Sequence, residues 1–155
     1  MRQDLLRGAS TPEGQPHPFV TLAVSPGATW DPSIPIAAAR AGAIGVLDLT
    51  LLTNVECALG TVARLNRFVR ERHGLVLHGR DGELERTVLE SVGACDVILL
   101  TPESRESLRR ILPKCRQVAR QIGVVVTSVD DLESVRELPI DFLIAKGVES
   151  GGWVG

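Results

Sequence analysis

The residues best suited to binding or catalysis stand directly after short apolar runs of the sequence. His78 ends one such run, and Lys146 ends another and is followed at once by Gly147. A charged residue ahead of a glycine-rich loop suits an anion or a planar cofactor, because glycine lets bare backbone N–H groups come close. The remaining candidates at such places are Ser25, Pro26, Gly27, Asp48, Thr50, Arg80, Thr101, Thr127, Ser128, Glu149, Ser150, Gly151 and Gly152.

Lys146 and His78 carry most of the chemistry that the sequence suggests. Lys146 could place its ammonium near an anionic oxygen, either of a phosphate or of a reduced flavin. His78 is the one histidine at the carboxyl end of an apolar run, which makes it a candidate site residue. A strand-end histidine can also be purely structural, and Thr101 and Ser128 are interpreted as helix caps.

The apolar runs predict the elements that hold these residues. Strands are predicted over residues 19–24, 44–49, 74–78, 96–100, 122–127 and 140–145. Helices are predicted between them: over 33–40, from a capping box at Thr53 to about residue 72, and after Asp81, Thr101 and Ser128. Pro113 should kink or end the fourth helix, since proline disfavours helical geometry at the residue before it.

This alternation of six strands and five helices predicts an α/β domain. Apolar strands without polar alternation are typical of parallel strands that helices cover. Two architectures fit: a doubly wound open sheet, and a (β/α)8 barrel of the TIM type, truncated after about six strands and five helices. A complete barrel has eight units, and the sequence reaches a loop after the sixth strand, which favours the truncated barrel. We expect a flexible leader over residues 1–18 and a partial barrel over residues 19–155.

Composition narrows the classes of function. The 155 residues carry a net charge of −2 and 3% aromatic residues, so neither a basic footprint nor stacking platforms for nucleic acid are expected. No apolar run reaches the roughly 18 residues of a membrane span. The basic residues between 105 and 120 are interpreted as a solvated helix face. Because Cys57, Cys95 and Cys115 lack metal-ligand spacing, no metal site is predicted, and the thiols indicate a reducing, cytoplasmic location.

The last ten residues carry a family resemblance. Lys146-Gly-Val-Glu-Ser-Gly-Gly-Trp-Val-Gly155 resembles the strand-six motif of the nitronate monooxygenase (2-nitropropane dioxygenase-like) FMN barrels, roughly G-x-E-A/S-G-G-H-x-G. Ala41-Gly-Ala-Ile-Gly-Val-Leu47 is similar to the A-G-G-L-G-V-L segment that enters strand two in that family. The resemblance extends loosely over residues 19–155. Related flavin barrels act as enoyl reductases, alone or alongside fatty-acid and polyketide synthases.

The resemblance implies a non-covalent FMN at the mouth of the barrel. Lys146 and Gly147 would lie near the flavin ring, in a cofactor-binding loop that also holds Glu149, Ser150, Gly151 and Gly152. Ser25-Pro26-Gly27 stands where the family usually has a short A-P-M segment against the isoalloxazine. His78 stands where many members have asparagine, which implies a contact to the flavin or its ribityl chain.

Two departures from the family matter. Trp153 stands where the family has its proton-abstracting histidine, and an indole has no acid–base capability. Proton removal by this residue is therefore excluded, which leaves His78 as the base or a hydride transfer that needs none. In these barrels the loops after strands seven and eight hold the phosphate, and neither strand is in the sequence. We expect unpaired edges at the first and sixth strands, completed by the remainder of a barrel from a longer chain or by self-association.

The function favoured by these observations is an FMN-dependent oxidoreductase acting on a small-molecule substrate, either nitronate monooxygenase-like or enoyl reductase-like in its chemistry. One alternative is a non-catalytic barrel module of a fatty-acid or polyketide-type synthase. Another is a phosphate-binding barrel isomerase or lyase, in which the glycine loop would meet a substrate phosphate.

Overall fold

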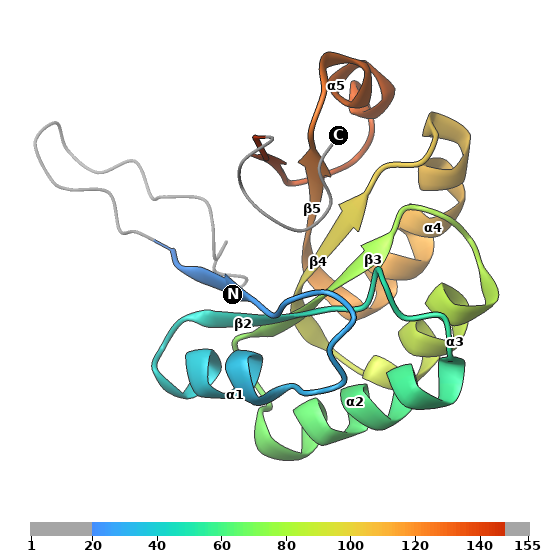
Figure 1. Ribbon diagram of the computed structural model, residues 1–155. Coiled ribbons are helices and arrows are strands. Elements are labelled where there is room, and N and C mark those ends of the chain that lie inside the picture. The colour runs from blue at the N-terminus through green and yellow to red at the C-terminus, as the bar shows by residue number, and fades with distance from the viewer. Residues whose placement is uncertain (1–19, 148–155) are drawn as a thin grey trace, which may run out of the picture.

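The computed structural model describes residues 20–147, in which strands and helices alternate along the chain (Figure 1). The strands are β1 Leu22–Val24, β2 Ile44–Asp48, β3 His73–His78, β4 Cys95–Thr101, β5 Ala119–Val126 and β6 Phe142–Ala145. The helices are α1 Ser33–Arg40, α2 Val55–Phe68, α3 Glu83–Val92, α4 Arg105–Val118 and α5 Val129–Val135. The predicted order of six strands and five helices is confirmed, and the leader at residues 1–18 lies outside the described residues.

The six strands form one parallel sheet in which spatial order equals sequence order, β1-β2-β3-β4-β5-β6. A doubly wound sheet reverses its strand order part-way, so that alternative is excluded. The sheet is curled into a half-barrel, with α1 to α4 along its convex side (Figure 1). This is the shape expected of a truncated barrel, while the assignment to the eight-stranded TIM type stays a prediction.

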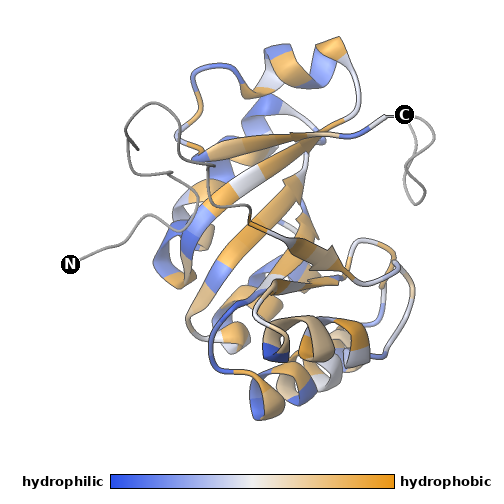
Figure 2. Cartoon of the chain, turned by 90° about the vertical axis from the view of Figure 1, so that its left-hand side faces the viewer, coloured by the Kyte–Doolittle hydropathy of each residue, from blue (hydrophilic) through white to orange (hydrophobic). Residues whose placement is uncertain are grey.

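Both faces of the sheet are apolar, as the unbroken hydrophobic runs predicted (Figure 2). The convex face packs against the helices through residues such as Leu47, Leu75 and Ile98, all of them buried. The concave face has its own smaller cluster, in which Val46 and Val97 are fully buried. Side chains therefore alternate between helix layer and concave face along each strand.

The two outer strands each pair along one edge, β1 with β2 and β6 with β5. The expectation of unpaired edges is therefore confirmed for the described part of the chain. No residue of β6 is fully buried, and Leu143 on its convex side is 43% exposed. Exposed edges of this kind offer unpaired backbone groups to another strand.

Two details of helix 105–118 differ from the sequence predictions. Thr101 ends β4, and the cap of α4 is Ser104, which forms a capping box with Ser107. Pro113 lies inside α4 without ending it. Its ring faces solvent, while Leu108 and Ile111 on the other face are buried against the sheet. Water can satisfy the carbonyl that proline leaves unbonded, and the buried stripe holds the helix together.

The amino ends of β3 and β4 contain a buried polar cluster around Asp96. Its carboxylate accepts hydrogen bonds from the backbone N–H groups of Arg72 and His73 and pairs with Arg120 at 3.0 Å. The His73 side chain is 2% exposed, and neither ring nitrogen has a hydrogen-bond partner. Burial lowers the pKa of His73 below its ordinary 6.5, and the nearby Asp96 opposes this only in part.

This histidine predicts a loss of stability in mild acid. Below pH 6.5 the unfolded chain binds a proton at His73, whereas the folded chain binds it only at a lower pH. The contribution of His73 to the free energy of unfolding is therefore fully present above pH 6.5 and decreases as the pH falls through 6.5. The slope from this one group cannot exceed about 1.4 kcal/mol per pH unit. Urea unfolding at pH 7.5, 6.5 and 5.5 measures it, above the range where ordinary carboxyl groups titrate. His73→Leu should flatten this dependence, and an unchanged slope would contradict the assignment.

Within residues 20–147, no helix combines the length and the apolar character needed to cross a lipid bilayer.

Candidate functional site

The carboxyl ends of the six parallel strands meet along one edge of the half-barrel (Figure 1). In curled parallel sheets this edge is where ligands bind. Of the predicted site residues, Ser25 follows β1, His78 ends β3 and Lys146 follows β6. The structure joins the first two through hydrogen bonds and places Lys146 on the far side of the same edge.

The first part of this edge links β1 to β2. The hydroxyl of Ser25, which is buried, accepts the backbone N–H of Asp48 at 2.9 Å. Asp48 Oδ1 in turn accepts the backbone N–H of Thr50 at 2.9 Å and its hydroxyl at 2.6 Å. Asp48 therefore shapes the turn after β2, and its carboxylate is satisfied by a neighbour in sequence.

His78 continues the connection across β3 and β4. Its Nε2 lies 2.7 Å from the carbonyl oxygen of Thr50, and its Nδ1 lies 3.2 Å from the hydroxyl of Thr101. A carbonyl can only accept, so Nε2 carries the hydrogen of the neutral ring. Nδ1 is then the basic atom, and it accepts from Thr101.

This arrangement fixes the orientation and tautomer of the His78 ring. The Thr101 hydroxyl also lies 3.5 Å from the carbonyl oxygen of Leu77, a second acceptor that is farther away than Nδ1. The geometry suits a ring that presents a fixed surface to a ligand better than one that exchanges protons at each turnover.

Lys146 occupies the opposite end of the edge. Its backbone N–H donates to the carbonyl oxygen of Val126 at 2.9 Å, which extends the β5–β6 pairing by one residue. Because Phe142 and Ile144 face the concave side, alternation places Lys146 on that side too. Three strand spacings separate it from His78, roughly 14 Å along the sheet and less across the curve. Among residues 20–147, no carboxylate lies within ion-pair distance of its ammonium.

The loop after β1 packs onto the loop after β2. Gly27 lies so near the side chain of Leu51 that an added Cβ would stand 2.9 Å from it. The carbonyl of Pro26 accepts the hydroxyl of Thr29 at 2.8 Å. Gly147 is exposed. The other predicted cofactor-binding residues, Glu149, Ser150, Gly151 and Gly152, lie outside the described residues, as does Trp153.

Sequence reasoning missed the connections on this edge. Thr50 and Thr101 are separated from His78 by 28 and 23 residues, and no local pattern relates them. It also missed Glu85, 1% exposed in the first turn of α3, whose Oε1 lies 3.1 Å from Arg80 Nε. Arg80, a candidate on this edge, is therefore engaged by a buried carboxylate.

Two of the three thiols are poorly suited to nucleophilic chemistry. Burial raises the pKa of the Cys95 thiol to about 12, and it does the same for Cys115. Such thiols remain protonated and are poor nucleophiles. Across the described ranges, no group of three or more His, Cys, Asp or Glu side chains is arranged to hold a metal ion.

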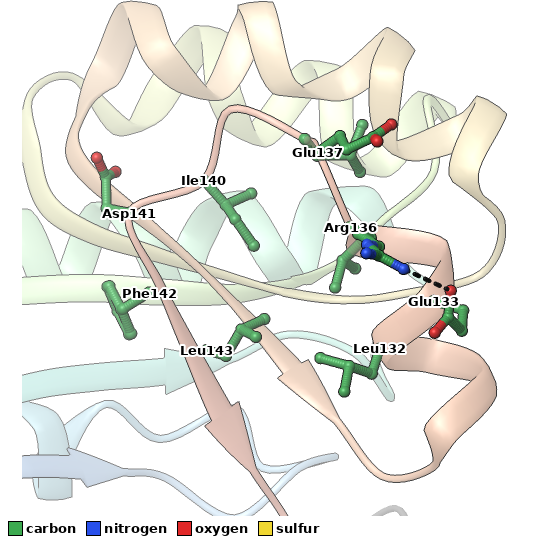
Figure 3. A pocket seen from close by; sticks show the side chains of 10 residues that line it. Leu132, Glu133, Arg136, Glu137, Ile140, Asp141, Phe142 and Leu143 are labelled. Atoms are coloured by element: carbon green, nitrogen blue, oxygen red, sulfur yellow. Dashed lines mark ion pairs between the residues drawn. The ribbon is translucent and has the colours of Figure 1, made fainter.

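An open pocket of about 620 Å³ lies beside α5 and β6, away from the carboxyl ends (Figure 3). Its apolar floor combines Leu132 from α5 with Leu143 from β6, and Arg136 pairs with Glu133 on its rim. The pocket borders the amino end of β6, so it is no part of the candidate site. Its lining residues are Leu132, Glu133, Val135, Arg136, Glu137, Leu138, Ile140, Asp141, Phe142 and Leu143.

Comparison with known proteins gave no match to a protein-family model, to a curated protein or to a solved structure. The resemblance to the nitronate monooxygenase family therefore stays a prediction.

Proposed function

We propose that this chain forms the FMN-binding portion of a flavin-dependent oxidoreductase with a small-molecule substrate. The observation that supports it most is the position of Lys146. This cation stands at the carboxyl end of β6, on the concave side, directly ahead of the glycine-rich motif. It has no carboxylate partner in the described part of the chain, so its charge is available for an anionic oxygen.

The remainder of the edge fits a planar ligand. The concave face below it is filled by buried apolar residues such as Val76 and Leu99, and a flavin ring would lie above this apolar layer. His78 is held by Thr50 and Thr101 at the rim of this face and would contact the ligand by surface and hydrogen bonding. FMN, when bound, would accept and release the electrons of the reaction. Lys146 would stabilise negative charge as it develops on the reduced ring.

Lys146→Ala should weaken FMN binding about tenfold. The loss of one charge-assisted hydrogen bond of about 1.5 kcal/mol corresponds to that factor. Quenching of flavin fluorescence during an FMN titration measures the dissociation constant, with the protein expressed as the longest polypeptide that its reading frame encodes. Arg109→Ala is the control, because it removes a cation that is also in no ion pair but lies exposed on the convex side.

Two results would count against this proposal. One is an absence of FMN binding, and the other is equal binding by Lys146→Ala and the control. If the chain is instead a phosphate-binding barrel, Lys146→Ala should weaken the binding of FMN but not of riboflavin, which lacks the phosphate. Ribose 5-phosphate should then displace FMN.

A second candidate function is a non-catalytic flavin-binding module. It is favoured by the hydrogen bonds at both His78 ring nitrogens, which leave no described histidine poised as a base. Flavin that is bound, yet reduced by neither NADH nor NADPH and unable to turn over nitronates, would support this candidate over the enzyme.

A further inference from the structure

The amino-end side of the half-barrel carries a basic patch built around an exposed aromatic ring. Phe68, at the end of α2, is 49% exposed. The guanidinium of Arg40, at the end of α1, lies 5.8 Å from the ring centroid, and that of Arg67 lies 5.7 Å from it. Arg72 donates to the carbonyl of Gly42 at 2.9 Å, which brings a further cation to the loop after α1.

The arginines of this patch differ from those elsewhere in the chain. On α3 and α4, and at Arg136 just after α5, nearly every arginine has a carboxylate partner, for example Arg105 with Glu137 and Arg116 with Asp141. Among the described residues, the arginines in no ion pair are Arg40, Arg67, Arg70, Arg72 and Arg109. All but Arg109 lie where α1 and α2 end. The one carboxylate in the segment 67–72 is Glu71.

We propose that this patch, comprising Arg40, Arg67, Phe68, Arg70 and Arg72, docks an acidic segment of a partner protein. Unpaired guanidinium groups bind carboxylates in bidentate geometry. The Phe68 ring, already flanked by two of them, offers an apolar anchor at the centre, and aromatic and arginine side chains are the usual hot spots of interfaces. The positive charge of the patch therefore favours a negatively charged segment as its binding partner.

Two other interpretations explain less. Cations at helix carboxyl ends are stabilised by the helix dipole, which accounts for Arg40 and Arg67 but not for Arg70, Arg72 or the exposed ring. Nucleic acid binding would require basic residues along a longer stretch of the surface, so that several phosphates are contacted. Here the cations gather where α1 and α2 end, in a chain of net charge −2, so a short acidic peptide fits the patch better.

The test uses a fluorescein-labelled peptide, Glu-Asp-Glu-Trp-Glu-Asp-Glu-Asp, and the full 155-residue chain. Fluorescence anisotropy at 50 mM NaCl measures the dissociation constant. The double variant R40Q/R67Q should raise it about tenfold, which corresponds to about 0.7 kcal/mol for each lost charge. Phe68→Ser should raise it about threefold. Arg109→Gln, an equal change of charge per site at the unpaired arginine outside the patch, should change it less than twofold. Circular dichroism confirms that each variant is folded.

Three outcomes would overturn the proposal. The wild-type chain could fail to bind the peptide. R109Q could weaken binding as much per charge as the double variant, which would mean that net charge alone is sensed. Single-stranded DNA of the same total charge could bind more tightly and lose affinity in R40Q/R67Q, which would make the patch a nucleic-acid site. Because the patch lies at the opposite end of the strands from Lys146, R40Q/R67Q should bind FMN as the wild type does, and the two proposals fail independently.

Discussion

Replacing Gly45 with alanine should lower the free energy of unfolding by about 3 kcal/mol, the upper part of the usual range for overpacking. A Cβ at this position in β2 would overlap the carbonyl oxygen of Pro35 in α1. The obstruction is backbone, so no side chain can rotate away to relieve it. Urea unfolding followed by circular dichroism measures the change in stability. We expect the packing of α1 against β2 to be lost.

Gly60→Ala provides the matched control for this substitution. Gly60 is an exposed residue inside α2, and an added Cβ would meet no atom within 4 Å. Alanine favours the helix over glycine by about 0.5–1 kcal/mol, so this variant should be slightly more stable than the wild type. If Gly45→Ala also left the stability unchanged, the close packing of α1 on β2 would be wrong.

Asp96→Ala should be about as damaging, lowering the free energy of unfolding by about 3 kcal/mol. The substitution removes the acceptor for the backbone N–H groups of Arg72 and His73, and each buried donor left without a partner costs about 1–3 kcal/mol. The same urea titration measures it.

Arg120→Gln separates the two roles of Asp96. The Arg120 side chain is 68% exposed while its partner Asp96 is buried, so solvent screens the arginine's charge and we expect the pair to contribute about 1 kcal/mol. This variant should therefore lose at most about 1 kcal/mol. An equal loss in both variants would show that Asp96 acts through its ion pair rather than through the backbone N–H groups.

The strand pattern could be predicted because parallel strands covered on both faces are encoded locally. Residues 97–100, for example, are all apolar. The strand predicted over residues 96–100 is β4 in the structure, with one more residue at each end. The sequential strand order could not be derived in the same way. It depends on which strands pair, and the apolar runs are too alike to specify this.

Helix starts were predicted less well than strands, for a physical reason. Asp81 was expected to cap α3, but α3 begins at Glu83, and its N-cap position is Gly82, which has no side chain to cap it. The Asp81 carboxylate instead reaches Lys114 of α4 at 2.6 Å. Ser128 does cap α5, with Asp131 completing the box. At α3, the distant Lys114 binds the carboxylate that the local pattern assigned to the cap.

The positions of the candidate residues on the sheet edge could be predicted, but their hydrogen-bond connections could not. Any polar residue at the carboxyl end of a strand falls on the same edge of a parallel sheet, which placed Ser25, His78 and Lys146 correctly along it. What His78 contacts depends on the register between β3 and β4, which sets it opposite Thr101. Register of this kind is a property of the assembled sheet.

The one-sided pairing of β6 has a consequence for any ligand held across the edge. His78 and Thr101 sit on strands bonded along both sides, whereas Lys146 extends a strand bonded along one side only. Segments with little buried surface detach at small free-energy cost. A ligand that bridges His78 and Lys146 would therefore hold β6 on the sheet, and part of its binding free energy would go into keeping that strand ordered. Ligand binding would then stabilise β6, and loss of the ligand would make its detachment easier.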